Sequence, residues 1–217
     1  MLQTLERTLT CETRMLTHAD RAALQSLCGP EGLPLLPPRT LGPALQNGQI
    51  LGDLAGDGEL RAALALLPLY ADEVLPASLR AAGYGADGQG AVLTPPLCAV
   101  HYPRLRQFLR AALGLAAARY ASYHVWAVQP LDGGGLPAGE ERCAQYLSAG
   151  MTLRAVRPMA GATMMVFSAR GLPHWREPRR RLHLGDPALP RLLERGYAVG
   201  DFSWGPGGME LLLRDAQ

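Results

Sequence analysis

The chain has no lysine, and it uses isoleucine and asparagine only once each, as Ile50 and Asn47. All 21 basic residues are therefore arginine, a bias that indicates a GC-rich bacterial genome. Because arginine is the only basic residue in use, clusters of arginine are weak evidence for a binding function. The formal net charge of +2 favours neither nucleic acid nor a membrane surface as a partner.

Cysteine is scarce too, and its spacing argues against a structural zinc site. The four cysteines, Cys11, Cys28, Cys98 and Cys143, form no C-x-x-C pair and have no cluster of histidines beside them. Structural zinc sites need closely spaced ligands of these types, so no metal is expected. We interpret the four residues as small side chains with reduced thiols.

Long apolar runs are absent as well. None reaches the roughly 20 residues of a membrane-spanning helix, and the first residues lack the basic-then-apolar order of a secretion signal. We therefore expect a cytoplasmic protein without a membrane partner. With 217 residues, 48% of them hydrophobic and 18% charged, the chain predicts one sizeable globular domain and a small appendage.

Apolar periodicity and turn signals predict alternating strands and helices up to about residue 170. The predicted strands cover 8–15, 49–55, 59–69, 91–100, 121–128, 151–158 and 162–169. The predicted helices cover 18–28, 40–47, 72–82, 103–118 and 139–149, and the glycine-rich stretch 133–139 is predicted to be a flexible loop.

Two short motifs add conformational detail to these elements. Asp57-Gly58 predicts a tight hairpin, because both of its turn positions favour positive φ. Pro95-Pro96 lies inside a predicted strand, and since proline cannot donate a hydrogen bond, that strand must be bulged or splayed. The second strand of the hairpin is predicted to have four apolar residues on one face: Leu60, Ala62, Leu64 and Leu66.

Residues 171–217 are predicted to form an appendage packed on a first domain of residues 1–170. They contain an arginine-rich loop with Arg176 and Arg179–Arg181, a helix near 187–195 and two short strands around 205–208. The apolar residues of this segment are too many for so small a unit to bury alone, so they need the surface of the first domain.

The segment Arg142-Cys-Ala-Gln-Tyr146-Leu-Ser-Ala-Gly150-Met151 ends a predicted helix and leads into a strand, with Gly150 suited to a left-handed C-cap. Together with the order of elements, it resembles the GNAT (Gcn5-related) N-acetyltransferase superfamily over about residues 8–170. The resemblance implies an α+β fold, with a mixed, mostly antiparallel central sheet flanked by helices. It also implies transfer of an acetyl or short acyl group from acyl-CoA to a primary amine of a small molecule or a protein.

In that superfamily the tyrosine of a Tyr-x-x-x-Gly-Phe motif often protonates the departing coenzyme A thiolate. The matching position makes Tyr146 the candidate catalytic acid, and a phenol is a suitable proton donor to a thiolate. The alternative is that Tyr146 is an aromatic residue packed one turn before the end of its helix.

A weaker resemblance follows the central strand, from Val100 to Leu113. In the superfamily a glycine-rich loop there binds the coenzyme A pyrophosphate through backbone N–H groups at the start of a helix. The glycines are missing here, so Arg104 and Arg106 would compensate through charge-assisted hydrogen bonds, unless they only form the solvent face of the helix. The cofactor contacts implied by the resemblance are Leu97, Cys98, Val100, Arg104, Arg106, Phe108, Leu109 and Arg110.

The resemblance also gives the proline pair a function. In the superfamily the central strand parts from its neighbour and admits the pantetheine arm, so that a backbone N–H near Leu97 or Cys98 would stabilise the oxyanion. The strand predicted at 91–100 contains no carboxylate to serve as general base. The remaining candidates are His124, His101 and Glu73, although attack by a neutral amine needs no side-chain base.

Two other functions stay open at this point. A GNAT-like domain that has lost catalysis and serves as a binding or regulatory module is favoured by the missing glycines and disfavoured by Tyr146. An RNA- or ribosome-associated module would work through Arg176–Arg181, but a solvated loop is the favoured explanation of that cluster and nucleic acid is not expected. Whether the chain forms a homodimer is also open.

Overall fold

The structure is a computed structural model that describes residues 11–28, 35–68, 90–99, 102–120, 124–131, 135–159, 161–169 and 180–215. Its helices are η1 (His18–Asp20), α2 (Arg21–Cys28), α3 (Pro38–Gln46), α5 (Leu105–Arg119), α6 (Gly135–Ser148) and α7 (Leu189–Glu194). Its strands are β1 (Cys11–Met15), β2 (Ile50–Ala55), β3 (Leu60–Pro68), β4 (Ala91–Leu93), β5 (Leu97–Cys98), β6 (Val125–Pro130), β7 (Thr152–Met159), β8 (Ala162–Ala169), β9 (Arg180–His183), β10 (Tyr197–Gly205) and β11 (Gly208–Asp215).

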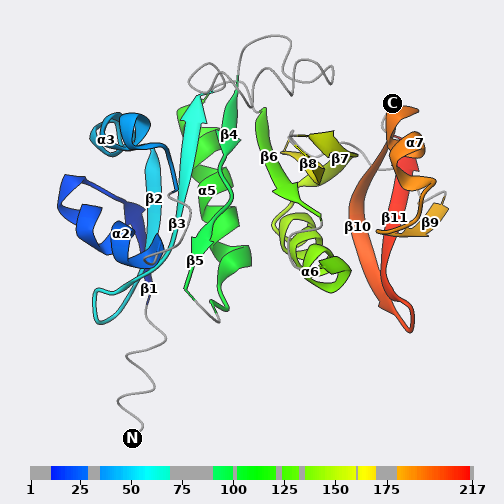
Figure 1. Ribbon diagram of the computed structural model, residues 1–217, viewed down its shortest axis with the longest axis horizontal. Coiled ribbons are helices and arrows are strands. Elements are labelled where there is room, and N and C mark those ends of the chain that lie inside the picture. The colour runs from blue at the N-terminus through cyan, green and yellow to red at the C-terminus, as the bar shows by residue number, and fades with distance from the viewer. Residues whose placement is uncertain are drawn as a thin grey trace, which may run out of the picture.

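The described strands form one sheet in the order β1-β2-β3-β4-β6-β8-β7-β10-β11-β9, and β5 is also paired with β3. The β4–β6 pair is parallel, whereas the other neighbouring pairs are antiparallel. The predicted α+β fold with a mixed, mostly antiparallel sheet is therefore confirmed. Figure 1 shows this sheet running from β1 and β2 at one end of the molecule to β10, β11 and β9 at the other.

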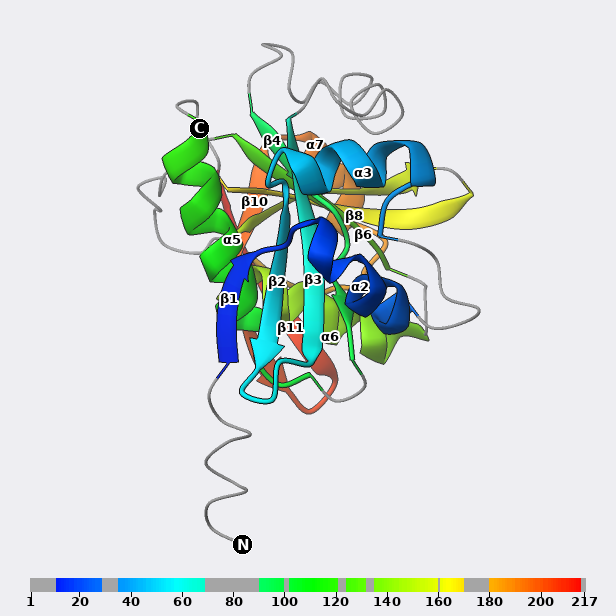
Figure 2. The same cartoon turned by 90° about the vertical axis from the view of Figure 1, so that its left-hand side faces the viewer.

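The described residues form three buried hydrophobic clusters, and two of them lie between the sheet and helices. The larger cluster lies beneath α5 and α6 and includes Phe108, Leu109 and Tyr146. The second cluster joins Leu24 of α2 and Leu45 of α3 to β2 and β3. Figure 2 shows α2 and α3 in front of these two strands. Burial on both faces explains why β3 is apolar along nearly its whole length.

The face predicted for Leu60 is wrong. Leu60 packs in the cluster with α2 and α3, whereas the other three residues of its predicted face pack beneath α5. The cause is a β-bulge, because Asp53 pairs with Ala62 while Leu54 pairs with Leu60. Arg61 is thus an extra residue on β3, and it reverses the alternation of side chains at the start of the strand.

Helix α6 begins at Gly135, so most of the stretch predicted as a flexible loop is helical. Pro137 is compatible with the first turn of a helix, where backbone N–H groups have no helical acceptor. Gly139 is required by close packing, because a Cβ atom there would lie 2.6 Å from the carbonyl oxygen of Leu131. The helix therefore starts early and presses against the end of β6.

The C-terminal elements continue the sheet of the preceding domain. Val199 of β10 pairs with Leu153 of β7, and β11 lies between β10 and β9. The buried leucines of α7 belong to the same cluster as α5 and α6. The predicted short strands are longer than expected, and Arg180 and Arg181 lie on β9 rather than in a loop.

Several predicted features lie outside the described residues: the helix at 72–82, Glu73, Val100, His101, Arg176 and Arg179. None of the described helices is long and apolar enough to cross a membrane.

Candidate active site

The central strand is interrupted, as Pro95-Pro96 predicts. Its two parts both pair with β3, through Leu66↔Leu93 and Ala63↔Leu97. Between these two pairs, β3 has two residues and the central strand has three. One extra residue on one of two paired strands defines a β-bulge. The prediction of a bulged strand at this position is confirmed.

The strand also parts from β6 at the same point. β6 pairs with β4 only through residues 125–127, so within the described sheet residues 128–130 have no partner strand on the side of β5. Figure 1 shows β5 and β6 diverging beyond β4. We call the divergence between β5 and residues 128–130 the strand parting. On that side of β6, the backbone groups of residues 128–130 therefore have no strand to pair with in the described sheet.

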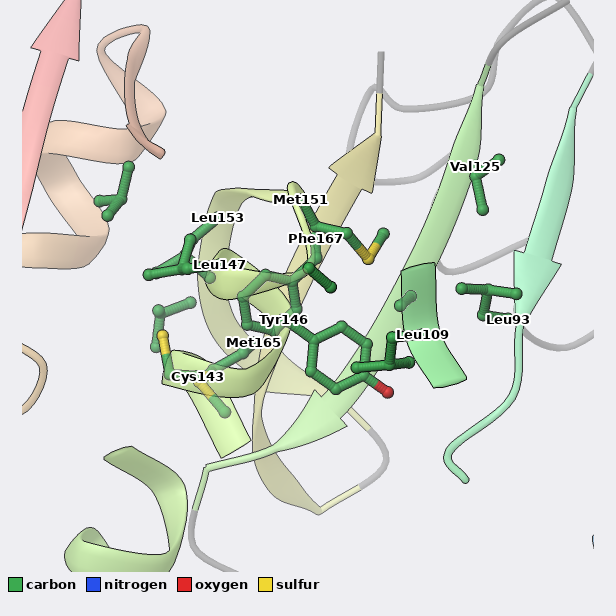
Figure 3. Close-up of a cluster of buried hydrophobic side chains, with 14 of the residues drawn as sticks. Leu93, Leu109, Val125, Cys143, Tyr146, Leu147, Met151, Leu153, Met165 and Phe167 are labelled. Atoms are coloured by element: carbon green, nitrogen blue, oxygen red, sulfur yellow. The ribbon is translucent and has the colours of Figure 1, made fainter. Parts of the chain in front are cut away.

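Tyr146 approaches the strand parting from α6. Its ring stacks on Phe167 of β8, with 4.9 Å between the ring centroids, and its side chain is 1% exposed. Figure 3 shows the hydroxyl pointing away from Phe167, toward the side on which Leu109 lies. Burial is the main cause that raises the pKa of Tyr146 above its usual value, so the phenol is protonated at neutral pH.

Two further polar side chains lie on the face of the sheet that Tyr146 covers: Cys98 packs against the same hydrophobic cluster, and Gln129 pairs with Met165 of that cluster. Cys98 of β5 also acts to raise the pKa of Tyr146, whereas Gln129 of β6 acts to lower it. Burial raises the pKa of the Cys98 thiol to about 11, so this thiol is neutral and a poor nucleophile. One side chain from each of β5, β6 and α6 thus converges on the strand parting.

Two of these groups are buried without partners. Within the described part of the chain, neither the Tyr146 hydroxyl nor the Gln129 Nε2 atom makes a hydrogen bond. Buried polar atoms almost always have a partner, so an unpartnered one needs an explanation. A ligand that enters the strand parting would supply the missing partners.

The start of α5 lies on the same face of the sheet. Phe108 and Leu109 are core residues, and the Phe108 N–H already donates to the Arg104 carbonyl at 2.9 Å. The side chains of these two residues are therefore not available to a ligand. The backbone N–H of Phe108 is not available either, because it is already bonded within the helix. The first backbone N–H groups of a helix have no acceptor within the helix. In α5 these groups belong to residues 105–107.

The three predicted arginines of this region have different surroundings. Arg104 lies 3.7 Å from the Asp53 carboxylate, and Arg110 donates to the Ser148 carbonyl at the end of α6. Arg106 is exposed in the first turn of α5 and has no hydrogen bond or ion pair with any residue that the structure describes. Arg106 is therefore the arginine best available to an anion.

Asp53 anchors the start of α5 and was not among the residues predicted from the sequence. It is fully buried on β2, and its carboxylate accepts hydrogen bonds from Thr13 at 2.5 Å and Tyr102 at 2.7 Å. The Arg104 guanidinium forms an ion pair with the same carboxylate. Because Tyr102 and Arg104 directly precede α5, this carboxylate holds the start of the helix against β1 and β2. Burial and the bond to Asp53 raise the pKa of Tyr102.

Replacing Tyr102 by phenylalanine is expected to lower the free energy of unfolding by about 1–3 kcal/mol, because a buried carboxylate oxygen loses its donor. Urea unfolding at pH 7 measures this. Tyr197→Phe removes a hydroxyl at the other end of the sheet and serves as control. Equal stability of the Tyr102→Phe variant and the unmutated protein would show that Asp53 does not anchor the helix.

His124, the candidate general base that falls within the described residues, is not brought to the strand parting. His124 precedes β6, at the end of the strand opposite to residues 128–130. At about 3.3 Å per residue it lies more than 10 Å along the strand from Gln129. No group of three or more metal-binding side chains occurs among the residues that the structure describes.

Comparisons with known proteins agree with this architecture. No protein-family model matches the sequence, and no curated protein matches it. Among solved structures, a GNAT-family acetyltransferase from Listeria monocytogenes 4b F2365 superimposes with a TM-score of 0.52 at 12% identity, covering 73% of this chain and 94% of that chain. A GNAT-family acetyltransferase from Bacillus cereus ATCC 10987 gives 0.53 at 8% identity, covering 76% and 99%.

A third similar structure is AAC(6')-Ib in complex with ribostamycin and coenzyme A. Its TM-score is 0.51 at 11% identity, and the match covers 75% of this chain and 94% of that chain. Identities at this level demonstrate the fold alone. The chain therefore has the GNAT fold, as its sequence predicts.

Proposed function

We propose that the protein is an N-acyltransferase that moves an acetyl or short acyl group from acyl-CoA to a primary amine. The observation that carries this proposal is the Tyr146 hydroxyl, buried without a hydrogen-bond partner among the described residues at the point where β5 and β6 part. The GNAT fold supports acyl-CoA as the donor, and the structure of AAC(6')-Ib with ribostamycin and coenzyme A supports a small amine as acceptor.

In the proposed reaction the amine nitrogen attacks the thioester carbonyl carbon, and the carbon–sulfur bond then breaks. The electron pair stays on sulfur, and Tyr146 gives its phenolic proton to that sulfur. A backbone N–H near Leu97 or Cys98 would donate to the carbonyl oxygen while negative charge develops on it. The proton lost by the amine leaves to solvent and restores the phenol, so no side-chain base is required.

The start of α5 is the proposed pyrophosphate site. The open backbone donors of residues 105–107 and the positive end of the helix favour an anion there. Arg106 adds a charged donor, and Arg104 adds a second one at the cost of its contact with Asp53. Side-chain charge thus compensates for the glycines that this helix start lacks.

Replacing Arg104 and Arg106 together by alanine is expected to weaken coenzyme A binding by about 1.5–3 kcal/mol for each charged hydrogen bond lost. Calorimetric titration of the variant with coenzyme A measures this change. Arg39→Ala removes an exposed arginine from α3 and is expected to bind as the unmutated protein does. Equal affinity of the double variant would place the phosphates elsewhere.

The proposed activity is tested by incubating the protein with acetyl-CoA and a panel of primary amines, and by measuring the coenzyme A thiol released. Release that depends on both the protein and the amine is expected. Tight coenzyme A binding without release for any amine would instead support the binding or regulatory module.

A further inference from the structure

Gln129 is a buried amide on the segment of β6 that lines the strand parting. Gln129 is 3% exposed. It pairs with Met165 of β8, on the face of the sheet that α6 covers. Tyr146 of α6 packs in the same hydrophobic cluster as Met165, so the two side chains lie on one face of the sheet. Neither the sequence pattern nor the resemblance gives Gln129 a function.

The amide and the phenol share an unusual feature. Both are more than nine-tenths buried, and neither the Gln129 Nε2 atom nor the Tyr146 hydroxyl makes a hydrogen bond within the described residues. A glutamine amide carries two N–H donors, so it can serve two acceptors at once. Two such groups on one face of the sheet can partner each other once a ligand accepts the Tyr146 proton.

We propose that Gln129 assists Tyr146 in acyl transfer by donating a hydrogen bond from Nε2 to the phenolic oxygen as the Tyr146 proton moves to the coenzyme A sulfur. This inference rests on the proposed function. In the step, the oxygen–hydrogen bond of Tyr146 breaks, a sulfur–hydrogen bond forms, and the oxygen keeps the electron pair. The amide donor stabilises the negative charge on that oxygen until solvent returns a proton.

The surroundings of Tyr146 explain why such a donor is needed. Burial and the Cys98 thiol disfavour the phenolate, and the Gln129 side chain is the group that opposes them. A hydrogen bond to the charged form of an acid favours ionisation and makes the acid stronger. Gln129 is therefore a positioning residue that acts through Tyr146.

Gln129→Met tests this assignment, because methionine has a similar length but no donor. Turnover with acetyl-CoA and a responsive amine is expected to fall about 10- to 150-fold, which corresponds to one hydrogen bond to a charged group. The KM for acetyl-CoA is expected to stay within about twofold. The melting temperature of the unliganded protein is expected to rise by about 2–4 °C, because an unpartnered buried amide is removed.

Two further variants distinguish the proposed hydrogen bond of Gln129 from a contribution to packing. Met165→Leu changes the cross-strand neighbour of Gln129 and is expected to keep its turnover. In a Tyr146→Phe background, Gln129→Met is expected to cause no further loss, because the group through which it acts is already gone. Full additivity of the two changes would overturn the proposal, as would unchanged turnover of Gln129→Met alone.

The outcome also distinguishes this inference from the proposed function on which it rests. Turnover by the unmutated protein together with unchanged turnover of Gln129→Met would overturn only the role of Gln129. Absence of coenzyme A binding by the unmutated protein would overturn both. If Gln129→Met fails to fold, Gln129→Leu is measured in its place, with the same expected results.

Discussion

Replacing Tyr146 by phenylalanine is expected to lower turnover by about 10²–10⁴-fold, the usual range for a positioned general acid. The affinity for coenzyme A is expected to change little, because the hydroxyl acts on the departing sulfur. The ring keeps its stacking on Phe167, so the fold is retained. Removing a buried hydroxyl that has no partner among the described residues is also expected to stabilise the unliganded protein.

Steady-state rates with a responsive amine, together with thermal melting, measure both effects. Tyr197→Phe is the matched control, since it removes a phenolic hydroxyl from β10 and is expected to leave turnover unchanged. A loss of turnover combined with higher stability is the signature of a group retained for function. Unchanged turnover of Tyr146→Phe would leave Tyr146 a packing residue.

A chain ending at Arg170 is expected to lose the folded state. This truncation removes β10 and β11, whose buried side chains Val199, Met209, Leu211 and Leu213 belong to the main hydrophobic cluster. It also removes α7, which packs on β7 with three buried leucines. Fully burying one such side chain contributes about 1.5–3 kcal/mol, so losing several exceeds the ~5–15 kcal/mol of a typical domain.

Amide hydrogen exchange on the intact and the truncated chain measures this effect. The truncated chain is expected to lose protection in β7 and α6 and to aggregate. Trp204→Ala in the intact chain is the control, because this side chain is 59% exposed and its removal is expected to leave protection unchanged. A truncated chain with full protection and coenzyme A binding would make residues 171–217 a detachable tail.

The order of elements was predictable because its signals are local. The apolar periodicity over 103–118 predicts α5 within two residues at its start, and Asp57-Gly58 predicts the hairpin of β2 and β3. Pro95-Pro96 predicts the interruption of the central strand, since a missing N–H disrupts any ladder. These features depend on residues that are neighbours in the chain.

The errors and omissions concern contacts between distant segments. The bulge that moves Leu60 to the other face depends on the register between two strands, which the composition of either strand does not determine. Asp53 and Gln129 were missed because their neighbours come from residues far along the chain: Tyr102 is 49 positions from Asp53. A polar residue inside a predicted strand, at a position expected to be buried, is the signal that could have found Asp53, whereas Gln129 lies one residue beyond the strand predicted at 121–128.

Titration of the full-length, unmutated protein with acetyl-CoA in a calorimeter tests the central claim most directly, because every proposed role depends on a cofactor held at the strand parting. The account predicts saturable binding to a single class of sites, with a dissociation constant within about 1 μM to 1 mM, the range that KM values of enzymes usually span. Absence of saturable heat up to about 1 mM acetyl-CoA would contradict the cofactor site, the acyl transfer and the roles of Tyr146 and Gln129 together.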